Sequence, residues 1–184
     1  TAVNGVQTLK IDKLAKSGYL TGGELAEDVT SSKKISEMNP DLVGEKLKIT
    51  IGGNDADAKF IEIKADTTIG DVVSELKNAG LNANFDEKSK RFFISSKKTG
   101  AAEDFSISNA DDSTKDLLGA LGLDYNATRA DEELCEKRDG IYYALDTANQ
   151  AAADRLNAGK GATKIDGQDA EIILNGAKFK SSDN

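Results

Sequence analysis

The segment 46–109 holds the most regular pattern in the chain and most restricts what the chain can fold into. Its first part, 46–51, alternates apolar and polar residues, and Gly52-Gly53-Asn54-Asp55 then supplies turn chemistry before a second strand-like run at 58–64. A period of two on both sides of a turn fits strands and does not fit a helix. These residues therefore predict a β-hairpin.

A helix is the next element that the sequence predicts. Thr68 can act as its N-cap, and Asp71 stands three residues later, where it completes a capping box. Apolar residues then recur at the spacing of one helical face, and Gly80 provides the stop. The apolar positions are Ile69, Val72, Val73 and Leu76.

Three more strands are expected after the helix. Residues 81–86 and 91–95 predict a second hairpin across the turn 87–89, and residues 105–107 mark a last strand. The aromatic side chains on these strands are expected in the core, with a ligand-stacking face as the alternative. Neighbours in a strand point to opposite faces, so one of two adjacent aromatics can be exposed where a sheet is covered on one side only. The set is Phe60, Phe92, Phe93 and Phe105, of which Phe92 and Phe93 are adjacent.

The amino-terminal flank carries weaker signals. Residues 6–11 alternate enough to be a strand, and 17–23 is interpreted as a loop. Residues 24–38 are too irregular to assign to an element. The only proline lies in Asn39-Pro40-Asp41, which predicts a turn.

The carboxy-terminal flank predicts two helices and a hairpin. Ser113 can cap a short leucine-rich helix, and the alanine-rich residues 144–158 predict a second helix that ends near Gly159. Asn175-Gly176 divides the apolar residues of 170–181 into two runs, which is the strongest short signal for a hairpin. The leucines of the first helix are Leu117, Leu118 and Leu121.

Together these elements predict an α+β fold that is rich in strands and built from two small modules. Residues 45–109 are expected to form a self-contained strand-strand-helix-strand head, inserted into a discontinuous β-rich leg domain made of 1–44 and 110–184. The two pieces of the leg domain are expected to pair with each other. Because the sequence starts within a strand-like pattern and stops just after another, we expect it to be a piece of a longer protein.

The charge balance and the apolar pattern exclude two classes of partner. Lys and Arg number 24 and Asp and Glu 32, which gives a net charge of −8, whereas a nucleic-acid partner needs a concentrated basic surface. The start of the chain lacks the charged and apolar regions of a signal peptide, and no stretch approaches the ~18 apolar residues of a membrane span. We therefore expect neither nucleic-acid binding nor membrane insertion.

The side chains available for chemistry are few. The chain has no His, which removes Ser-His-Asp and Cys-His catalysis and most zinc sites. Its single cysteine, Cys135, excludes an internal disulfide and is expected to be a passive residue on a helix. Neighbouring carboxylates are the remaining candidates, and we interpret them as solvated turns or helix starts. They are Asp111-Asp112, Glu132-Glu133 and Asp55 with Asp57. We expect no catalytic residue, no cofactor and no enzymatic activity.

Three segments resemble ligand-binding motifs without meeting their requirements. The acidic segments 55–60 and 124–129 lack the glycine that a calcium loop needs. The glycine-rich segment 159–164 lacks the first glycine and the final hydroxyl residue of a phosphate loop, so it is interpreted as a linker after a helix stop. Asn126-Ala127-Thr128 has the spelling of a glycosylation sequon and is interpreted as a polar turn. No metal site is expected.

A family resemblance enters with the centre and the two ends of the chain. Residues 46–100 resemble the flagellin hook IN motif of bacterial flagellar axial proteins. Residues 5–15, 117–123 and 167–176 are similar to segments of the flagellar filament cap family, hook-associated protein 2. The runs that carry the resemblance are Ala65-Asp66-Thr67-Thr68-Ile69-Gly70-Asp71-Val72-Val73, Arg91-Phe92-Phe93-Ile94-Ser95-Ser96, Gly5-Val6-Gln7-Thr8-Leu9-Lys10-Ile11, Leu117-Leu118-Gly119-Ala120-Leu121-Gly122-Leu123 and Gln168-Asp169-Ala170-Glu171-Ile172-Ile173-Leu174-Asn175-Gly176.

This resemblance implies a structural protein of the bacterial flagellum. It would be secreted through the flagellar apparatus and would act outside the cell, at the filament tip, as a homo-oligomeric cap that helps flagellin polymerise. The coiled-coil segments that anchor the cap in this family are missing from the sequence, so the chain is expected to be the head and leg region and to be monomeric or weakly associated by itself. The alanine-rich residues 131–164 are not part of the resemblance.

Two other functions remain open at this point. The chain could be an adhesive tip domain that binds host mucus or glycans. It could also be the outer variable domain of a flagellin, which would share the central motif but should lack the order of end segments found here. An enzyme ranks last.

Overall fold

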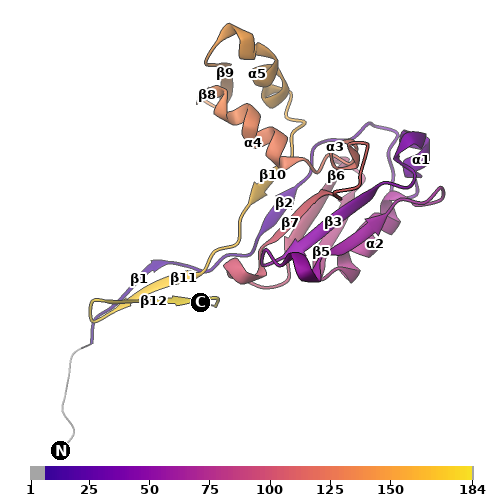
Figure 1. The fold of residues 1–184 in the computed structure, drawn as a ribbon. Helices are drawn as coiled ribbons and strands as arrows, with labels where there is room; N and C mark the ends of the chain where they lie inside the picture. Colours follow the sequence, from indigo (N-terminus) through magenta and orange to yellow (C-terminus); the bar gives the residue numbers. More distant parts are fainter. Residues whose placement is uncertain (1–6, 184) are drawn as a thin grey trace, which may run out of the picture.

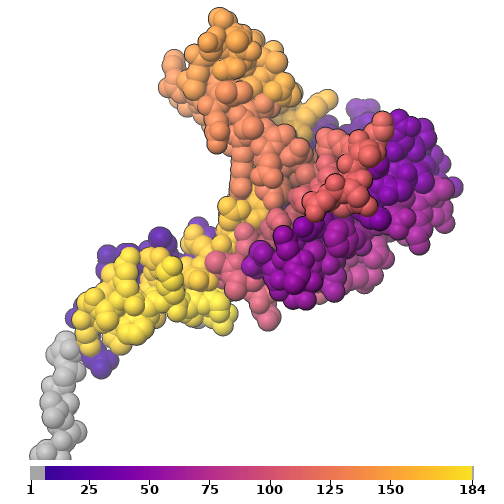
Figure 2. Space-filling model, viewed as in Figure 1, coloured from indigo at the N-terminus to yellow at the C-terminus, as the bar shows by residue number. Residues whose placement is uncertain are grey.

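The computed structural model describes residues 7–183 and shows an α+β fold with many short strands, as predicted. Three parts are visible in Figure 1. A globular head contains residues 17–123 and 160–165, a lobe of residues 124–159 projects from it, and an extended leg is formed by 7–16 together with 166–183. The space-filling view shows the lobe and the leg leaving the head in different directions (Figure 2).

Two small antiparallel sheets form most of the head. In the first, β3 (Lys46–Ile51) lies between β4 (Lys59–Glu62) and β7 (Phe105–Asn109). The second has four strands, and two of them come from the flanks of the chain. In spatial order they are β10 (Thr163–Ile165), β2 (Tyr19–Thr21), β6 (Arg91–Ser96) and β5 (Leu81–Asp86). Both predicted hairpins are confirmed.

The single long helix of the head, α2 (Ile69–Asn78), follows the prediction in detail. The backbone N–H of Asp71 donates to Thr68 Oγ1 at 3.1 Å, and the backbone N–H of Thr68 donates to Asp71 Oδ2 at 2.9 Å. All four predicted apolar positions are buried. Gly80 ends the helix with a φ of +105°, a value that favours glycine.

One apolar core fills the head and draws on every part of its sequence. The central residues contribute their inward faces, and both flanks add fully buried leucines. Those leucines include Leu20, Leu42, Leu117, Leu121 and Leu123. The core thus extends across residues 45 and 109, and the division into an inserted head of 45–109 and a leg domain of 1–44 with 110–184 stays a prediction.

Several shorter elements connect these parts. They are α1 (Ile35–Met38), the 3-10 turns at Pro40–Leu42, Asp55–Asp57, Ala101–Glu103 and Thr147–Asn149, and α3 (Leu117–Ala120). The turn predicted at the proline is confirmed, since Asn39 Oδ1 accepts from the N–H of Asp41 at 3.0 Å.

The predicted loop at 17–23 is wrong, because β2 lies within it. Three residues are too few to show a period, and the strand exists because β6 and β10 supply its hydrogen-bond partners.

Two predictions about the carboxy-terminal flank are also corrected. The N-cap of α3 is Asp116, whose Oδ1 accepts from the N–H of Gly119 at 2.8 Å, while Ser113 donates to the carbonyl of Lys46 at 3.1 Å. The helix expected at 144–158 is shorter, with α5 spanning Gln150–Asn157. Its start is delayed because Asp146 accepts from the N–H of Ala148 and forms a local turn.

The aromatic residues of the head divide as the strand geometry requires, with one exception. Phe92 and Phe105 are buried, and Phe93, which faces the other side of β6 from Phe92, is exposed. Phe60 was expected in the core and is 55% exposed. It lies beside Lys48 on the opposite face of β4 from the buried Ile61, so the apolar character of the residue did not decide its position.

The leg is a single three-stranded sheet in the order β1 (Leu9–Lys13), β11 (Ala170–Leu174) and β12 (Ala177–Ser181). The predicted hairpin is confirmed, with positive φ at both residues of its Asn-Gly turn. The part of the first predicted strand that includes Val6 lies outside the described residues. In the register of the sheet, Ile11, Ile172 and Phe179 form one row across the three strands. Leu9, Ile11 and Phe179 are half or more exposed, so one apolar face of the leg is uncovered.

The lobe consists of two helices and a hairpin. Its elements are α4 (Tyr125–Glu133), β8 (Cys135–Arg138), β9 (Ile141–Ala144) and α5. Only small side chains, Ala152 and Ala153, are fully buried beneath the hairpin, so the lobe has a thin core.

A buried charge cluster lies where the head, the lobe and the leg meet. Lys164 of β10 has only 2% of its side chain exposed, and its Nζ lies 2.8 Å from Asp104 Oδ1 and 3.0 Å from Asp166 Oδ1. The ammonium also lies 4.9 Å from the ring centroid of Phe105 and 5.8 Å from that of Tyr125. These partners belong to the head, the start of the leg and the first turn of α4. One side chain therefore links all three parts.

Arg129 extends this cluster from α4. Its Nη2 lies 3.0 Å from Asp166 Oδ1 and also donates to the carbonyl of Lys164 at 3.3 Å. Burial works to raise the pKa of Asp166, but hydrogen bonds from Lys164 and Arg129 outweigh it and hold the pKa below its ordinary value. The carboxylate form of Asp166 is therefore stabilised by the fold.

Replacing Lys164 should strongly destabilise the protein. In Lys164→Ala the partly buried carboxylate of Asp104 loses its partner, and we expect a loss of roughly 3 kcal/mol in the free energy of unfolding, measured with urea. The matched control is Lys178→Ala, which removes a largely exposed lysine paired with Glu171 and should change that free energy by less than about 1 kcal/mol. Equal effects of the two variants would contradict this account of the cluster.

The same cluster should make stability sensitive to acid. Because the folded pKa of Asp166 is below its unfolded value of 3.8, its contribution is present above that value and is lost as the pH falls through the folded pKa. Asp166→Asn should therefore lower the free energy of unfolding at pH 7, and the difference from the wild type should shrink as the pH is lowered below about 3.8. Urea titrations from neutral to acidic pH test this, and a difference that does not depend on pH would rule it out.

Candidate functional site

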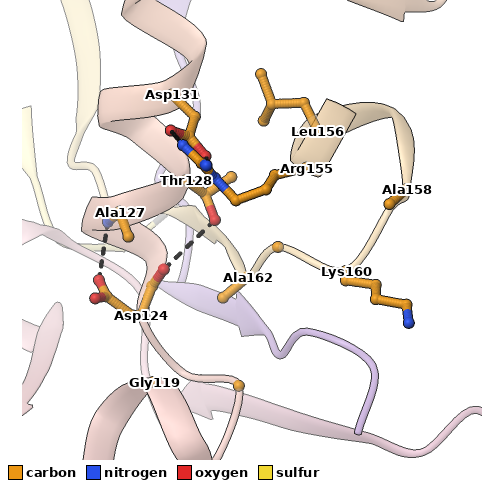
Figure 3. A pocket seen from close by; sticks show the side chains of 12 residues that line it. Gly119, Asp124, Ala127, Thr128, Asp131, Arg155, Leu156, Ala158, Lys160 and Ala162 are labelled. Atoms are coloured by element: carbon orange, nitrogen blue, oxygen red, sulfur yellow. Dashed lines mark hydrogen bonds and ion pairs between the residues drawn. The ribbon is translucent and has the colours of Figure 1, made fainter. Parts of the chain in front are cut away.

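A cavity of roughly 350 Å³ lies at the base of the lobe, between α4, α5 and the end of α3 (Figure 3). One wall is a single face of α4, because Asp124, Ala127, Thr128 and Asp131 stand at the spacing of successive helical turns. Its volume falls within the usual range of ligand pockets, about 300 to 1,000 Å³.

Glycines allow the chain to close around this cavity. The N–H of Gly23 donates to the carbonyl of Gly122 at 2.7 Å, and a Cβ on Gly23 would lie only 2.0 Å from the carbonyl oxygen of Lys160. Gly122 itself has a φ of +65°. No larger residue could occupy position 23 without moving the 160–162 segment that forms the far wall.

The polar groups of the cavity are mostly satisfied by one another. Arg155 binds Asp131 with two hydrogen bonds, Nε to Oδ2 at 2.8 Å and Nη2 to Oδ1 at 2.6 Å, and this contact raises the pKa of Arg155 above its ordinary value. Asp124 Oδ1 accepts from the N–H of Ala127 at 2.8 Å as the cap of α4. Lys160 lies at the rim, and among residues 7–183 its ammonium has no ion-pair partner (Figure 3).

The remaining lining is apolar and, apart from Leu156, small. It comes from Gly119, Ala127, Leu156, Ala158, Gly161 and Ala162. Such walls can bury an apolar side chain or ring, and the free ammonium of Lys160 favours an occupant with a negative charge beside the apolar part. The cavity has the character of a docking pocket.

The other carboxylate clusters considered in the sequence do not line this cavity, and Asp111-Asp112 instead line a separate, open hollow beside Phe60. Asp55 and Asp57 lie in an exposed 3-10 turn, and Asp111-Asp112 form an exposed turn in which Asp112 pairs with Lys46 at 3.6 Å. Glu132, at the end of α4, accepts a hydrogen bond from the hydroxyl of Tyr142. Within residues 7–183 no group of three or more Cys, Asp or Glu side chains is placed to hold a metal ion.

Two predictions about residues of the lobe are corrected. Cys135 is the first residue of β8 and not part of a helix, because α4 ends at Glu133. Asn126 lies in the first turn of α4 and not in a polar turn, since the cap formed by Asp124 starts the helix just before it.

The glycine-rich segment after α5 is held by an arginine of the head. Arg91 donates through Nη1 to the carbonyl of Gly22 at 2.8 Å and through Nη2 to that of Gly159 at 2.7 Å. Gly159 has a φ of +67°, which fits the predicted helix stop, and the chain then enters β10. The interpretation of 159–164 as a linker is wrong at its end, because pairing with β2 makes Thr163–Ile165 a strand.

None of the helices in residues 7–183 is both long enough and apolar enough to cross a membrane.

The comparisons with known proteins give one structural likeness. A scan against protein-family models and a search of curated proteins find no match. Among solved structures, the chain is similar to the D2-D3 domains of the flagellar cap protein FliD from Escherichia coli, with a TM-score of 0.59 and 20% sequence identity. The alignment covers 100% of this chain and 77% of that one. At this identity the likeness shows a FliD-like fold.

The ion pair at the end of the cavity should hold the lobe together. Arg155→Ala leaves Asp131, which has 16% of its side chain exposed, without its cation, and we expect faster amide hydrogen exchange in α4 and α5 while the head stays protected. Arg155→Lys should be intermediate because lysine cannot form the paired contact. Arg138→Ala, which breaks an exposed pair with Glu136 in the same lobe, serves as the control, and an equal effect there would contradict the prediction.

Proposed function

We propose that this chain is the head and leg region of a bacterial flagellar filament cap protein, which acts at the filament tip and promotes flagellin polymerisation. The observation that carries the proposal is the agreement of two independent signals. The order of segments along the sequence resembles the cap family, and the fold is similar to that of FliD D2-D3 domains over the whole chain. A flagellin outer domain would share only the first of these signals in part.

The proposed action is mechanical. A cap must present fixed surfaces to incoming flagellin, and the charge cluster around Lys164 supplies a rigid junction from which head, lobe and leg extend in set directions (Figure 2).

The uncovered leg face is the proposed attachment to the rest of the assembly. A three-stranded sheet needs its apolar face covered to be stable in water, and Leu9, Ile11 and Phe179 are exposed on that face. The coiled-coil segments of the cap family would supply apolar helical surface for this purpose. In this arrangement the leg connects the outward head to the filament, outside the cell.

Genetic complementation tests the proposed function. Deleting the gene for the full-length protein should leave cells that secrete unpolymerised flagellin, and the wild-type gene should restore filaments, as seen by electron microscopy of cells and immunoblots of the medium. Normal filaments in the deletion strain would overturn the proposal.

The same strain tests the role of the leg. Ile11→Glu places a charge in the apolar row and should restore filaments poorly, whereas Lys180→Glu, on the charged face of the same sheet, should restore them well. Full restoration by Ile11→Glu would contradict attachment through this face.

A further inference from the structure

The hairpin of the lobe carries an apolar ridge on its outer face. Strand residues two apart share a face, and the register pairs Ile141 with Arg138 and Tyr143 with Glu136. The apolar members of this face, Leu134, Ile141, Tyr143 and Leu145, are between 40% and 65% exposed and are called the ridge below. The backbone N–H of Leu145 donates to the carbonyl of Leu134, so the two ends of the ridge are joined.

The ridge has no role in the lobe's own core. The opposite face of the hairpin packs on α5, where Asn157 holds the backbone of Tyr142 by two hydrogen bonds of 2.8 Å. The thin core beneath it is closed by Ala152 and Ala153. The four large apolar side chains on the far face are therefore not needed to fold the lobe. Tyrosine with arginine nearby is the usual composition of an interface hot spot.

The cavity at the base of the same lobe matches the ridge in chemistry. The uncharged part of its lining is mostly small and apolar, and its volume of roughly 350 Å³ is sufficient for one aromatic side chain. The charges also match, because Lys160 at the rim has no ion-pair partner in the described part of the chain and Glu136 stands directly opposite Tyr143 on the ridge. Within residues 7–183 the Glu136 carboxylate is bound only to the exposed Arg138, a contact that costs little to exchange.

We propose that the ridge of one copy docks into the lobe cavity of a second copy, with Tyr143 as the anchor and Glu136 facing Lys160. The inference deepens the proposed function and rests on it for the self-association of the cap, since it names the surfaces through which copies meet. The hairpin lies at the outer end of the lobe, beyond α4 (Figure 1). The residues that line the cavity lie at the base of the lobe (Figure 3). A contact between two different surfaces is heterologous, so each copy keeps one free ridge and one free cavity, and successive copies form a ring or an open chain.

Sedimentation velocity of the 184-residue chain over a series of concentrations tests the contact. Tyr143→Ser should lower self-association by removing the anchor, and Ala127→Leu should lower it by filling the cavity from α4. The matched controls are Phe60→Ser, which removes an exposed aromatic ring from the head, and Ala130→Leu, which adds the same side chain to an exposed part of α4 outside the cavity. Both controls should associate like the wild type.

Mixing the two variants distinguishes a heterologous contact from a symmetric one. Tyr143→Ser chains keep an intact cavity and Ala127→Leu chains keep an intact ridge, so the mixture should form dimers although each variant alone is monomeric. Growth beyond the dimer should not occur, because the two remaining surfaces are defective. No dimer in the mixture, where the wild type self-associates, would overturn the proposal.

Disulfide trapping covers the case of weak association. In a Cys135→Ser background, Glu136→Cys chains mixed with Lys160→Cys chains should form mixed disulfides several-fold faster than Phe60→Cys chains mixed with Lys160→Cys chains. Equal rates would overturn the proposed contact. Complementation separates this contact from the proposed cap function. If full-length protein carrying Tyr143→Ser or Ala127→Leu restores filaments normally, the contact is wrong and the cap function stands. If the deletion strain has normal filaments, the cap function itself is wrong.

Discussion

The geometry of this protein depends on one buried ammonium group. Lys164 sits almost out of contact with water, where an unpaired charge would cost several kcal/mol, so its carboxylate partners must be in place whenever the chain is folded. Asp104 comes from the edge of the head and Asp166 from the start of the leg, while Tyr125 and Arg129 bring α4 to the same point. A charge that accepts only one arrangement of its partners sets the directions in which the leg and the lobe leave the head.

The apolar residues are distributed unevenly around this junction. The head buries a continuous core, whereas the leg and the lobe each have one face of large apolar side chains that nothing in residues 7–183 covers. Both faces lie on paired strands. The opposite side of the leg sheet is polar, and the opposite side of the lobe hairpin packs on α5, so both apolar faces are ordered surfaces. A monomer gains no stability from such faces, and their free energy is recovered only in an assembly.

Local signals in the sequence were sufficient for much of the fold. The capping box at Thr68 and Asp71, the helix stop at Gly80 and the Asn-Gly hairpin each depend on residues within a few positions of one another, and each was confirmed. Where two local caps competed, the prediction failed. The sequence predicts Ser113 as the cap of α3, but its hydroxyl donates to the carbonyl of Lys46, 67 positions away, and Asp116 is the cap. Distant partners decide such cases, and a single sequence does not reveal them.

The cavity and the charge cluster lay beyond sequence reasoning for the same physical reason. Lys164 stands in a glycine-rich segment that was interpreted as a linker, and its burial follows from strand pairing between residues 20 and 164. The sequence indicates a strand at this position only through Thr163 and Ile165, two residues common in strands that flank Lys164. The cavity likewise joins Gly119, Ala127 and Leu156, which carry no common motif.

The net charge of the chain also restricts how identical copies could assemble. Its net charge of −8 opposes the approach of identical copies, so association needs a contact that is both apolar and locally matched in charge. The ridge and the cavity meet both conditions, because Glu136 lies beside the apolar side chains of the ridge and Lys160 lies beside those of the cavity. Since the junction at Lys164 fixes the lobe relative to the head, the angle between successive copies is also fixed. Whether such a series of copies closes therefore depends on the buried charge in the head as much as on the surfaces that touch.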